Sequence, residues 1–356
     1  MTTLTMPPRL EENATPRPLP WRRLAWVTWR QHRIALGGVA TLLGVLGLWL
    51  WIVGLQLHHA YAAAAACHPA SSAACQNLIA TFDSTNVFLK GGFILQPLPA
   101  LIGAFVGAPV LARELETGTF RYTWTQGFGR WRWALAKLVL LGAGVAATAE
   151  AFSLLLSWYY QPYVATGNQS VFSSPSPLSP GLFDLRGVAF AAWTLAAFAI
   201  GALAGILIRR VVPAIVATLA AYTGLALLAG NVLRQHYLTP LVAKNSNIPG
   251  SAWVTSEWWT KGGKFAFGGR PPLSLLPQLC PSSFQTGTGG PGGVGILGSG
   301  SLSPTQCLVQ HGYTQWADYQ PASHFWPFQW IEGGWLLALS VLLITVTVWL
   351  VRRGAA

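Results

Sequence analysis

The charged side chains that could bind a partner or do chemistry are concentrated in one short stretch, residues 113–137. This stretch lies between two uncharged apolar runs, residues 98–112 and 138–149. Its charged residues are Arg113, Glu114, Glu116, Arg121, Arg130, Arg132 and Lys137. Arginine and glutamate side chains form strong charge-assisted hydrogen bonds with a complementary protein surface. The pattern indicates a membrane protein that offers a docking element to a cytoplasmic partner.

The docking element is centred on the sequence R-E-L-E-T-G-T at residues 113–119. This sequence is compatible with a helix as far as Gly118, and glycine is a common C-terminal stop for a helix. We expect Glu114 and Glu116 to pair with basic groups of the partner. The residues expected to couple the two proteins are Arg113, Glu114, Glu116, Thr117, Gly118, Thr119 and Arg121.

Motifs of catalytic chemistry are missing from the chain. No G-x-x-x-x-G-K-[ST], H-E-x-x-H or G-x-S-x-G sequence occurs, so we expect no catalytic residue, no bound metal and no cofactor. Glu150 is the one carboxylate deep within an apolar run, and burying it there is costly. It could contact a cationic substrate or hydrogen-bond to a neighbouring helix, and the sequence leaves both interpretations open.

The composition indicates that the bilayer is part of the solvent. Apolar residues make up 52% of the 356 residues and charged residues 9%, against roughly 25% charged in an average soluble protein. The net charge of +12 could indicate a nucleic-acid partner. However, the basic residues cluster at the ends of apolar runs rather than along one polar face, which argues against nucleic acid.

About 20 apolar residues cross the hydrocarbon core as a helix. We expect an all-α membrane protein with a disordered cytoplasmic tail (1–20) and a single transmembrane domain (21–356). Its six spans are expected at about residues 34–55, 87–111, 133–158, 187–208, 211–232 and 328–351. A small-residue sequence at Ala60–Ala62 resembles a signal-peptide cleavage site, but the preceding apolar run is longer than a usual signal core. We therefore expect the first span to remain uncleaved.

The arginines predict how the spans are oriented. Basic residues are dense before span one, between spans two and three, between spans four and five, and after span six. These segments all lie on one side when six spans are threaded, and the positive-inside rule makes that side the cytoplasm. We therefore expect a multi-pass protein of the plasma membrane with both termini inside and an outer loop at 238–323. The interleaved tryptophans and arginines of residues 21–33 predict a helix on the inner membrane surface, although they could also be an ordinary basic flank.

The residues on the outer side carry further predictions. All four cysteines lie there, where disulfides persist, and the local pairing Cys67–Cys75 and Cys280–Cys307 needs the least rearrangement of the chain. A metal site built on the histidines near Cys67 lacks the usual ligand spacing and is disfavoured. The aromatic residues that end span three (158–160) and begin span six (326, 330) are expected at the outer interface. Trp253, Trp258 and Trp259 are expected to touch lipid headgroups, the rest of the outer loop to be flexible, and Glu332 to reach water.

The motif around the docking element resembles that of the permease subunits of ABC-2 type transporters. That family shows a proline-containing second span, then A-R-E-x-E-x-G-T, an arginine, a tryptophan and a lysine. The matching positions are Pro109, Ala112, Arg113, Glu114, Glu116, Gly118, Thr119, Arg130, Trp133 and Lys137.

The resemblance implies that residues 113–121 form a coupling helix that docks in a groove of a separate ATPase subunit, which holds ATP and Mg. It also implies a second permease copy or paralogue, and the export of a hydrophobic or amphiphilic compound. The outer segment before span six is longer and richer in glycine than is typical of the family. One alternative is an ion-gradient-driven secondary transporter, which predicts internal repeats that we do not find. The other is a non-transport membrane module, which predicts paired catalytic groups in the spans, whereas Glu150 stands alone.

Overall fold

The computed structural model describes residues 21–69, 71–85, 92–118, 130–165, 176–244, 248–272, 274–280 and 304–353. The chain is mostly helical, and within these ranges six helices are long and apolar enough to cross a membrane. They are α1 (Trp21–Ala66), α4 (Leu98–Thr117), α6 (Arg130–Ala165), α8 (Val188–Ile208), α9 (Val211–Leu228) and α12 (Phe325–Arg353). The prediction of a helical, multi-pass membrane protein with six spans is confirmed.

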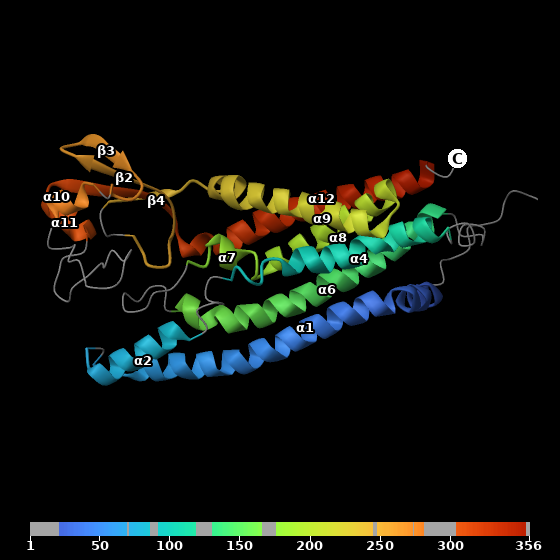
Figure 1. Cartoon of the computed structure of the whole chain (residues 1–356), viewed down its shortest axis with the longest axis horizontal. Coiled ribbons are helices and arrows are strands. Elements are labelled where there is room, and N and C mark those ends of the chain that lie inside the picture. The colour runs from blue at the N-terminus through green and yellow to red at the C-terminus, as the bar shows by residue number, and fades with distance from the viewer. Residues whose placement is uncertain are drawn as a thin grey trace, which may run out of the picture.

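The helices define two ends of one bundle (Figure 1). At the end that we call the basic end, α4 and α12 finish, α6 and α9 begin, and the chain carries Arg113, Lys137, Arg209, Arg210, Arg352 and Arg353. At the opposite end, the loop end, lie α2 (Ala73–Ser84), α7 (Pro180–Phe183) and a small β-sheet. The tail at residues 1–20, which was predicted to be disordered, lies outside the described residues, and so do residues 281–303 of the outer loop, which was predicted to be flexible.

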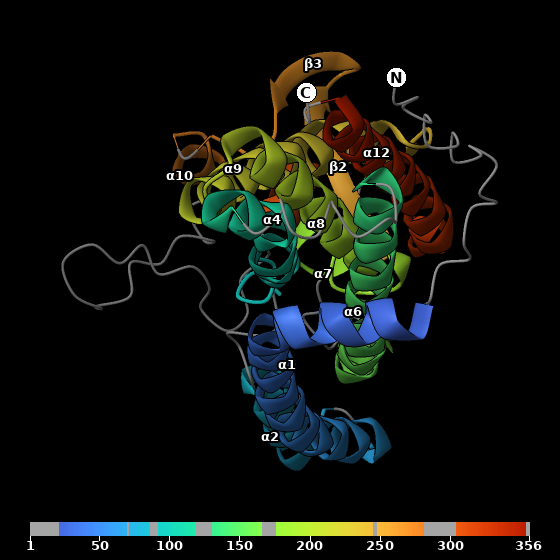
Figure 2. The same cartoon turned by 90° about the vertical axis from the view of Figure 1, so that its right-hand side faces the viewer.

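Helix α1 differs from its prediction in length. Its 46 residues are continuous, so that the expected surface helix and the first span are one element that extends to Ala66. In Figure 2, which looks onto the basic end, the first turns of α1 lie across the end of the bundle and the remainder runs along it. At 1.5 Å per residue the helix is about 70 Å long, more than twice the ~30 Å hydrocarbon core. It therefore extends well beyond the bilayer.

The second span starts later than the sequence predicted. Helix α4 begins at Leu98 and not at residue 87, because residues 93–97 form turns that end at Pro97. Pro99 lies in the first turn of the helix, where a missing N–H costs nothing. Pro109 lies inside the helix and is tolerated there, as prolines in membrane helices can be when neighbours satisfy the freed carbonyl.

Helix α8 lies at the centre of the bundle and packs against α4, α6, α9 and α12. Its closest neighbour is α4, and each helix brings a G-x-x-x-G sequence to the contact, Gly103–Gly107 on α4 and Gly201–Gly205 on α8. A Cβ atom added to Gly205 would lie 2.6 Å from the Ala108 carbonyl oxygen. Small residues at this spacing let two membrane helices approach backbone to backbone. The α4–α8 pair is therefore a close-packed unit.

The long loop before the sixth span contains a folded sheet, which the sequence analysis did not predict. Strands β1 (Leu241–Lys244), β4 (Tyr313–Gln320), β2 (Trp253–Lys261) and β3 (Lys264–Gly268) pair antiparallel in this order. Short helices α10 (Leu276–Leu279) and α11 (Pro304–Gln310) adjoin it. The described residues of this loop are thus ordered. Trp259 is buried against Leu276 and Leu308, so its expected role as a lipid contact is wrong.

The aromatic residues at the end of span three are also placed differently from their prediction. Helix α6 continues to Ala165, and Tyr159 and Tyr160 are fully buried among the helices rather than at a membrane interface. Trp158 stacks on Trp51 and His58 of α1. On the other hand, Trp326 and Trp330 are exposed at the start of α12, as an interfacial position requires.

Candidate functional site

The residues of the expected docking element form the last turn of α4. The helix ends at Gly118, whose φ of 71° is the left-handed conformation that glycine adopts most easily. Arg113, Glu116 and Thr117 are exposed on this turn. Thr119 and Arg121 lie outside the described residues. In the described part of the chain the element is therefore the end of the second span and not a separate helix.

Glu114 points into the bundle instead of outward. Its Oε1 atom lies 2.6 Å from the Lys137 Nζ atom on α6, and the two side chains are 14% and 1% exposed. The Lys137 ammonium group also donates to the Val110 carbonyl at 3.3 Å and to the Gln31 side-chain oxygen at 3.2 Å. One buried lysine thus joins α4, α6 and α1. We call this cluster the clamp.

The clamp borders a cavity of about 410 Å³ between the first turns of α1 and the end of α4. His32 lines this cavity and is 7% exposed, and its Nε2 atom has no hydrogen-bond partner in the described structure. Lys137 and Arg113 line the same cavity. Most residues that line this cavity are polar or charged, whereas the bundle around it is apolar. The cavity therefore places charged groups of the basic end next to the buried part of the bundle.

Glu116 joins α4 to a fourth helix. Its Oε2 atom accepts a hydrogen bond of 3.2 Å from the Val211 backbone N–H, the first residue of α9. A carboxylate at this position satisfies a free N–H and complements the positive end of the helix dipole. Glu114 and Glu116 are therefore both occupied within the chain, whereas the sequence analysis expected both to face a partner protein.

The turn between α8 and α9 contains a strained residue. Arg209 ends α8 with φ 60°, and it is the one positive-φ residue other than glycine in the described part of the chain. This conformation costs a non-glycine residue roughly 1–2 kcal/mol. Backbone strain of this kind tends to persist where the side chain is used.

A second polar cluster lies at the loop end, around Arg234. This side chain is fully buried, and its guanidinium donates to both oxygens of Glu332 at 2.7 and 3.0 Å and to Asp184. Glu332 is 0% exposed and also accepts from the Trp193 indole N–H at 2.8 Å and from the Tyr237 hydroxyl at 3.1 Å. Arg234 lies 4.3 Å from the Phe183 ring centroid. We call this cluster the buried network.

The buried network holds two carboxylates and one guanidinium. Glu332 makes the larger number of hydrogen bonds, and both of its oxygens accept from Arg234. Asp184 is 21% exposed, and its burial together with the negative charge of Glu332 raises its pKa to about 7, although the positive charge of Arg234 acts in the opposite direction. Burial thus favours the neutral form of Asp184, which limits the excess of negative charge in the cluster.

Sequence reasoning missed this network. Glu332 was expected to reach water, which is wrong, because α12 places it against α8 and α9. Arg234 lies in the 3₁₀ turn Arg234–His236, which continues α9 through a π-helical turn, and so it belongs to the end of the fifth span. The available signal was that Arg234 follows the fifth apolar run and Glu332 lies near the start of the sixth, so both were expected on the same side of the membrane.

Glu150 is partly exposed on α6, and no hydrogen bond or ion pair joins it to another residue that the structure describes. The interhelical bond considered for it is therefore not formed within these residues of a single chain.

All four cysteines form disulfide bonds at the loop end, Cys67 with Cys75 and Cys280 with Cys307. The first bond connects the end of α1 to α2, and the second connects α10 to α11. His311 lies beside the second pair, with its Nδ1 atom 3.8 Å from the Cys307 sulfur. Sulfur atoms held in a disulfide are not thiolate ligands, so this group does not present a metal site.

Comparison with known proteins gives one match. The family described as ABC-2 membrane transporter related matches residues 40–234, more than half of the chain. The matched residues run from within α1 to Arg234 and so include the Glu114–Lys137 pair of the clamp, the α4–α8 pair and the turn at Arg209. No curated protein and no solved structure matches. The chain belongs to the ABC-2 membrane transporter related family, and it is a membrane transport subunit rather than an ATPase.

Proposed function

We propose that this chain is the transmembrane subunit of an ABC exporter whose ATP is hydrolysed by separate cytoplasmic subunits. The basic end faces the cytoplasm and receives the ATPase at the last turn of α4. A second copy or a paralogue completes the membrane part. The cargo is a hydrophobic or amphiphilic compound.

The observation that carries this proposal is the set of connections at the basic end. Glu114 joins α4 to α6 and, through Lys137, to Gln31 of α1, while Glu116 joins α4 to α9. A protein that displaces the exposed face of this turn, at Arg113 and Thr117, therefore displaces four helices together. That is the property a coupling element needs, since the nucleotide is bound on another subunit.

Two features support the orientation. Membrane proteins carry an excess of arginine and lysine on the cytoplasmic side, and the basic end has this excess. The loop end carries both disulfides, which persist in oxidising compartments and are rare in the cytosol.

The nature of the cargo is argued from a cavity of about 390 Å³ between α1, α4 and α6. Most of its lining is aliphatic, including Leu36, Val39, Ile102 and Leu141. Ligand sites of 300–1,000 Å³ with mostly apolar walls hold drug-sized molecules. The adjoining surface of α1 exposes many large apolar side chains, so a lipophilic compound could reach this cavity from the bilayer.

The coupling proposal is tested by purifying the tagged chain from its native membranes. We expect a P-loop ATPase to co-purify with it. Arg113→Glu reverses an exposed charge on the docking turn and should abolish this association. Lys264→Glu makes the same change on the exposed tip of the sheet at the loop end and should leave the association intact.

The clamp is tested separately with Glu114→Leu/Lys137→Met, which replaces a buried ion pair with apolar side chains. The ATPase should still associate, but transport in reconstituted vesicles should fall at least about tenfold, because α4 no longer moves α6 and α1. The proposal is wrong if no ATPase co-purifies with the wild-type chain. It is also wrong if Arg113→Glu and Glu114→Leu/Lys137→Met both export the cargo normally.

The orientation is tested with single cysteines at exposed positions of the two ends, Lys264→Cys and Arg352→Cys. An impermeant maleimide added to intact cells should label position 264 and not 352. The reverse pattern would invert the topology.

A further inference from the structure

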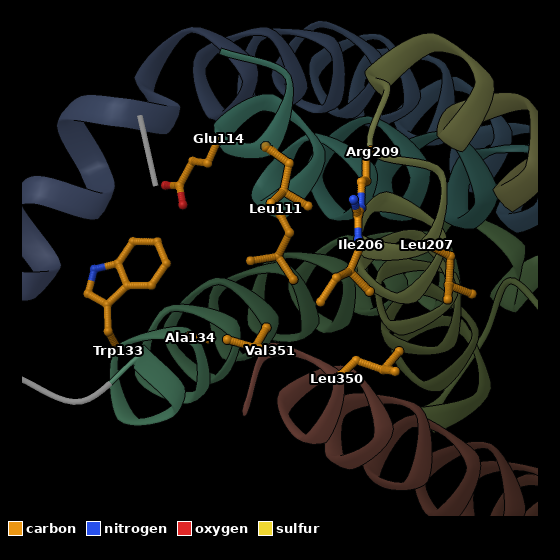
Figure 3. Close-up of a pocket in the computed structure, with 10 residues that line it drawn as sticks. Leu111, Glu114, Trp133, Ala134, Ile206, Leu207, Arg209, Leu350 and Val351 are labelled. Atoms are coloured by element: carbon orange, nitrogen blue, oxygen red, sulfur yellow. The ribbon is translucent and has the colours of Figure 1, made fainter. Parts of the chain in front are cut away.

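A third cavity lies at the basic end, between α4, α6, α8 and α12 (Figure 3). Its volume is about 160 Å³, and its walls are mainly aliphatic: Leu111, Leu115, Ile206, Leu207, Leu350 and Val351. This is close to the ~150 Å³ of engineered apolar cavities that bind benzene. It is too small for a drug-sized molecule, for which sites of 300 Å³ and more are usual. The space therefore suits a short segment of a flexible apolar chain.

The cavity continues to a surface that would face lipid. Leu207 is 62% exposed although it lines the cavity, so an apolar chain can enter from the side. Trp133 lies at the edge of the cavity (Figure 3), and tryptophan prefers the headgroup level of a bilayer. Four spans begin or end around this cavity, which also places it at the level where hydrocarbon meets headgroups.

Arg209 brings a positive charge to this apolar cavity. Its side chain lies on the wall formed by α8, opposite Glu114 (Figure 3). No carboxylate pairs with Arg209 within the described residues. The backbone at this turn has φ 60°, which glycine would adopt without strain, yet the sequence places a long cationic side chain here. Arg209 is exposed as well as lining the cavity, so its guanidinium is free to meet an anionic group at the cavity entrance.

Glu114, the one acidic residue that lines the cavity, does not repel an anion. The Glu114 carboxylate is bonded to the Lys137 ammonium at 2.6 Å, so the two charges cancel. The neighbouring basic residues Arg210, Arg352 and Arg353 add positive charge to the same end of the bundle. The electrostatic environment thus favours a negatively charged headgroup.

We propose that this cavity binds an anionic phospholipid, with part of one acyl chain between α4, α8 and α12 and the phosphate on Arg209. The proposal goes beyond transport of the cargo, since this cavity is distinct from the one between α1, α4 and α6. A lipid bound here would lie beside the clamp and contact α4 and α6, two of the three helices that the clamp joins. The site does not depend on which leaflet the basic end faces.

The test is native mass spectrometry of the purified full-length chain, titrated with phosphatidylglycerol or with phosphatidylcholine of the same acyl chains. The wild type should retain phosphatidylglycerol in preference to phosphatidylcholine. Arg209→Gln should lower the affinity for phosphatidylglycerol about fivefold, the effect of one arginine near an anionic headgroup. Arg210→Gln is the matched control, because Arg210 is exposed like Arg209 but has an ordinary extended backbone and does not line the cavity.

Two further variants separate binding from folding. Arg209→Gly relieves the backbone strain and should fold at least as well as the wild type, yet it should lose phosphatidylglycerol to the same extent as Arg209→Gln. Leu207→Trp places a larger side chain at the entrance and should reduce binding while Arg209 remains. Glycerol 3-phosphate, which carries the phosphate without acyl chains, should not displace the lipid at equal concentration.

Four results would overturn the proposal. The first is equal retention of the two lipids by the wild type. The second is wild-type retention by both Arg209 variants. The third is displacement by glycerol 3-phosphate, which would make the site one for a free anion. If Arg210→Gln lowers binding as much as Arg209→Gln, the effect is general surface charge, and the assignment to this cavity is equally wrong.

Discussion

The buried network pairs one guanidinium with two carboxylates, so removing the guanidinium should lower the stability of the fold by an amount that can be calculated. Arg234→Met removes the only guanidinium in contact with Glu332 among the described residues. The Glu332 carboxylate is 0% exposed and would keep only the Trp193 and Tyr237 donors. Leaving one buried partner uncompensated costs about 3–5 kcal/mol. We therefore expect a thermal midpoint lower by on the order of 10 °C.

The double variant Arg234→Met/Glu332→Leu should recover at least half of this loss. It replaces both charges with apolar groups of similar volume, which in other proteins is often neutral. The recovery is incomplete because the Trp193 N–H then loses its acceptor, at a cost of about 1–3 kcal/mol. Asp184 also loses its cation, but it is partly exposed and can take up a proton.

The assay is thermal unfolding of the detergent-purified chain, followed by circular dichroism. Lys244→Met is the control, since this lysine is exposed on β1 and its removal should change stability by less than about 0.5 kcal/mol. A double variant that is no more stable than Arg234→Met would refute the reasoning, because the loss would then not come from an unpaired charge.

Three other changes have expected outcomes. Burial raises the pKa of Asp184 from 3.8 to about 7, so between these pH values the folded chain binds a proton that the unfolded chain lacks. Stability should therefore fall as the pH rises from about 4 to 7. Asp184→Asn should remove most of this dependence in a pH series of melting curves. Gly205→Leu should destabilise the fold by several kcal/mol, since its Cβ would lie 2.6 Å from the Ala108 oxygen, whereas Gly224→Leu on α9, where a Cβ meets no atom within 4 Å, should be tolerated in the same assay. Cys280→Ser/Cys307→Ser removes a disulfide bond between residues 27 positions apart and should destabilise the sheet region by about 3–4 kcal/mol. The loss should appear as faster proteolysis after β3. Unchanged cleavage would contradict a stabilising role for this bond.

Local composition was sufficient to predict the helices of the bundle. The spans from Val188 to Ile208 and from Val211 onward were predicted within a few residues, because a run of about 20 apolar residues needs no distant partner to be recognised. The first span was predicted too short, since the alanines before Cys67 continue the helix beyond the hydrophobic core. Apolar length indicates where a helix crosses a bilayer and not where the helix stops.

Interactions between distant residues could not be predicted in this way. The sheet pairs Trp253 with Gln320 across 67 positions, and its strands alternate too weakly to identify from one sequence. Glu114 was expected to face a partner protein, but Lys137, to which it is bonded, lies on another helix, so its inward direction could not be predicted from the sequence. The close contact of α4 and α8, by contrast, could have been predicted from their two G-x-x-x-G sequences.

The order of the buried network along the chain has a consequence for how the protein is made. Asp184 and Arg234 are synthesised before Glu332, which follows 98 residues after Arg234. Until the last helix enters the membrane, the arginine at the end of α9 lacks its main counter-ion, and an unpaired charge at such a site is costly. Chains that stop before residue 332 would expose this defect to quality control in the membrane. Insertion of the sixth helix is thus the step that completes the charge pairing of the buried network.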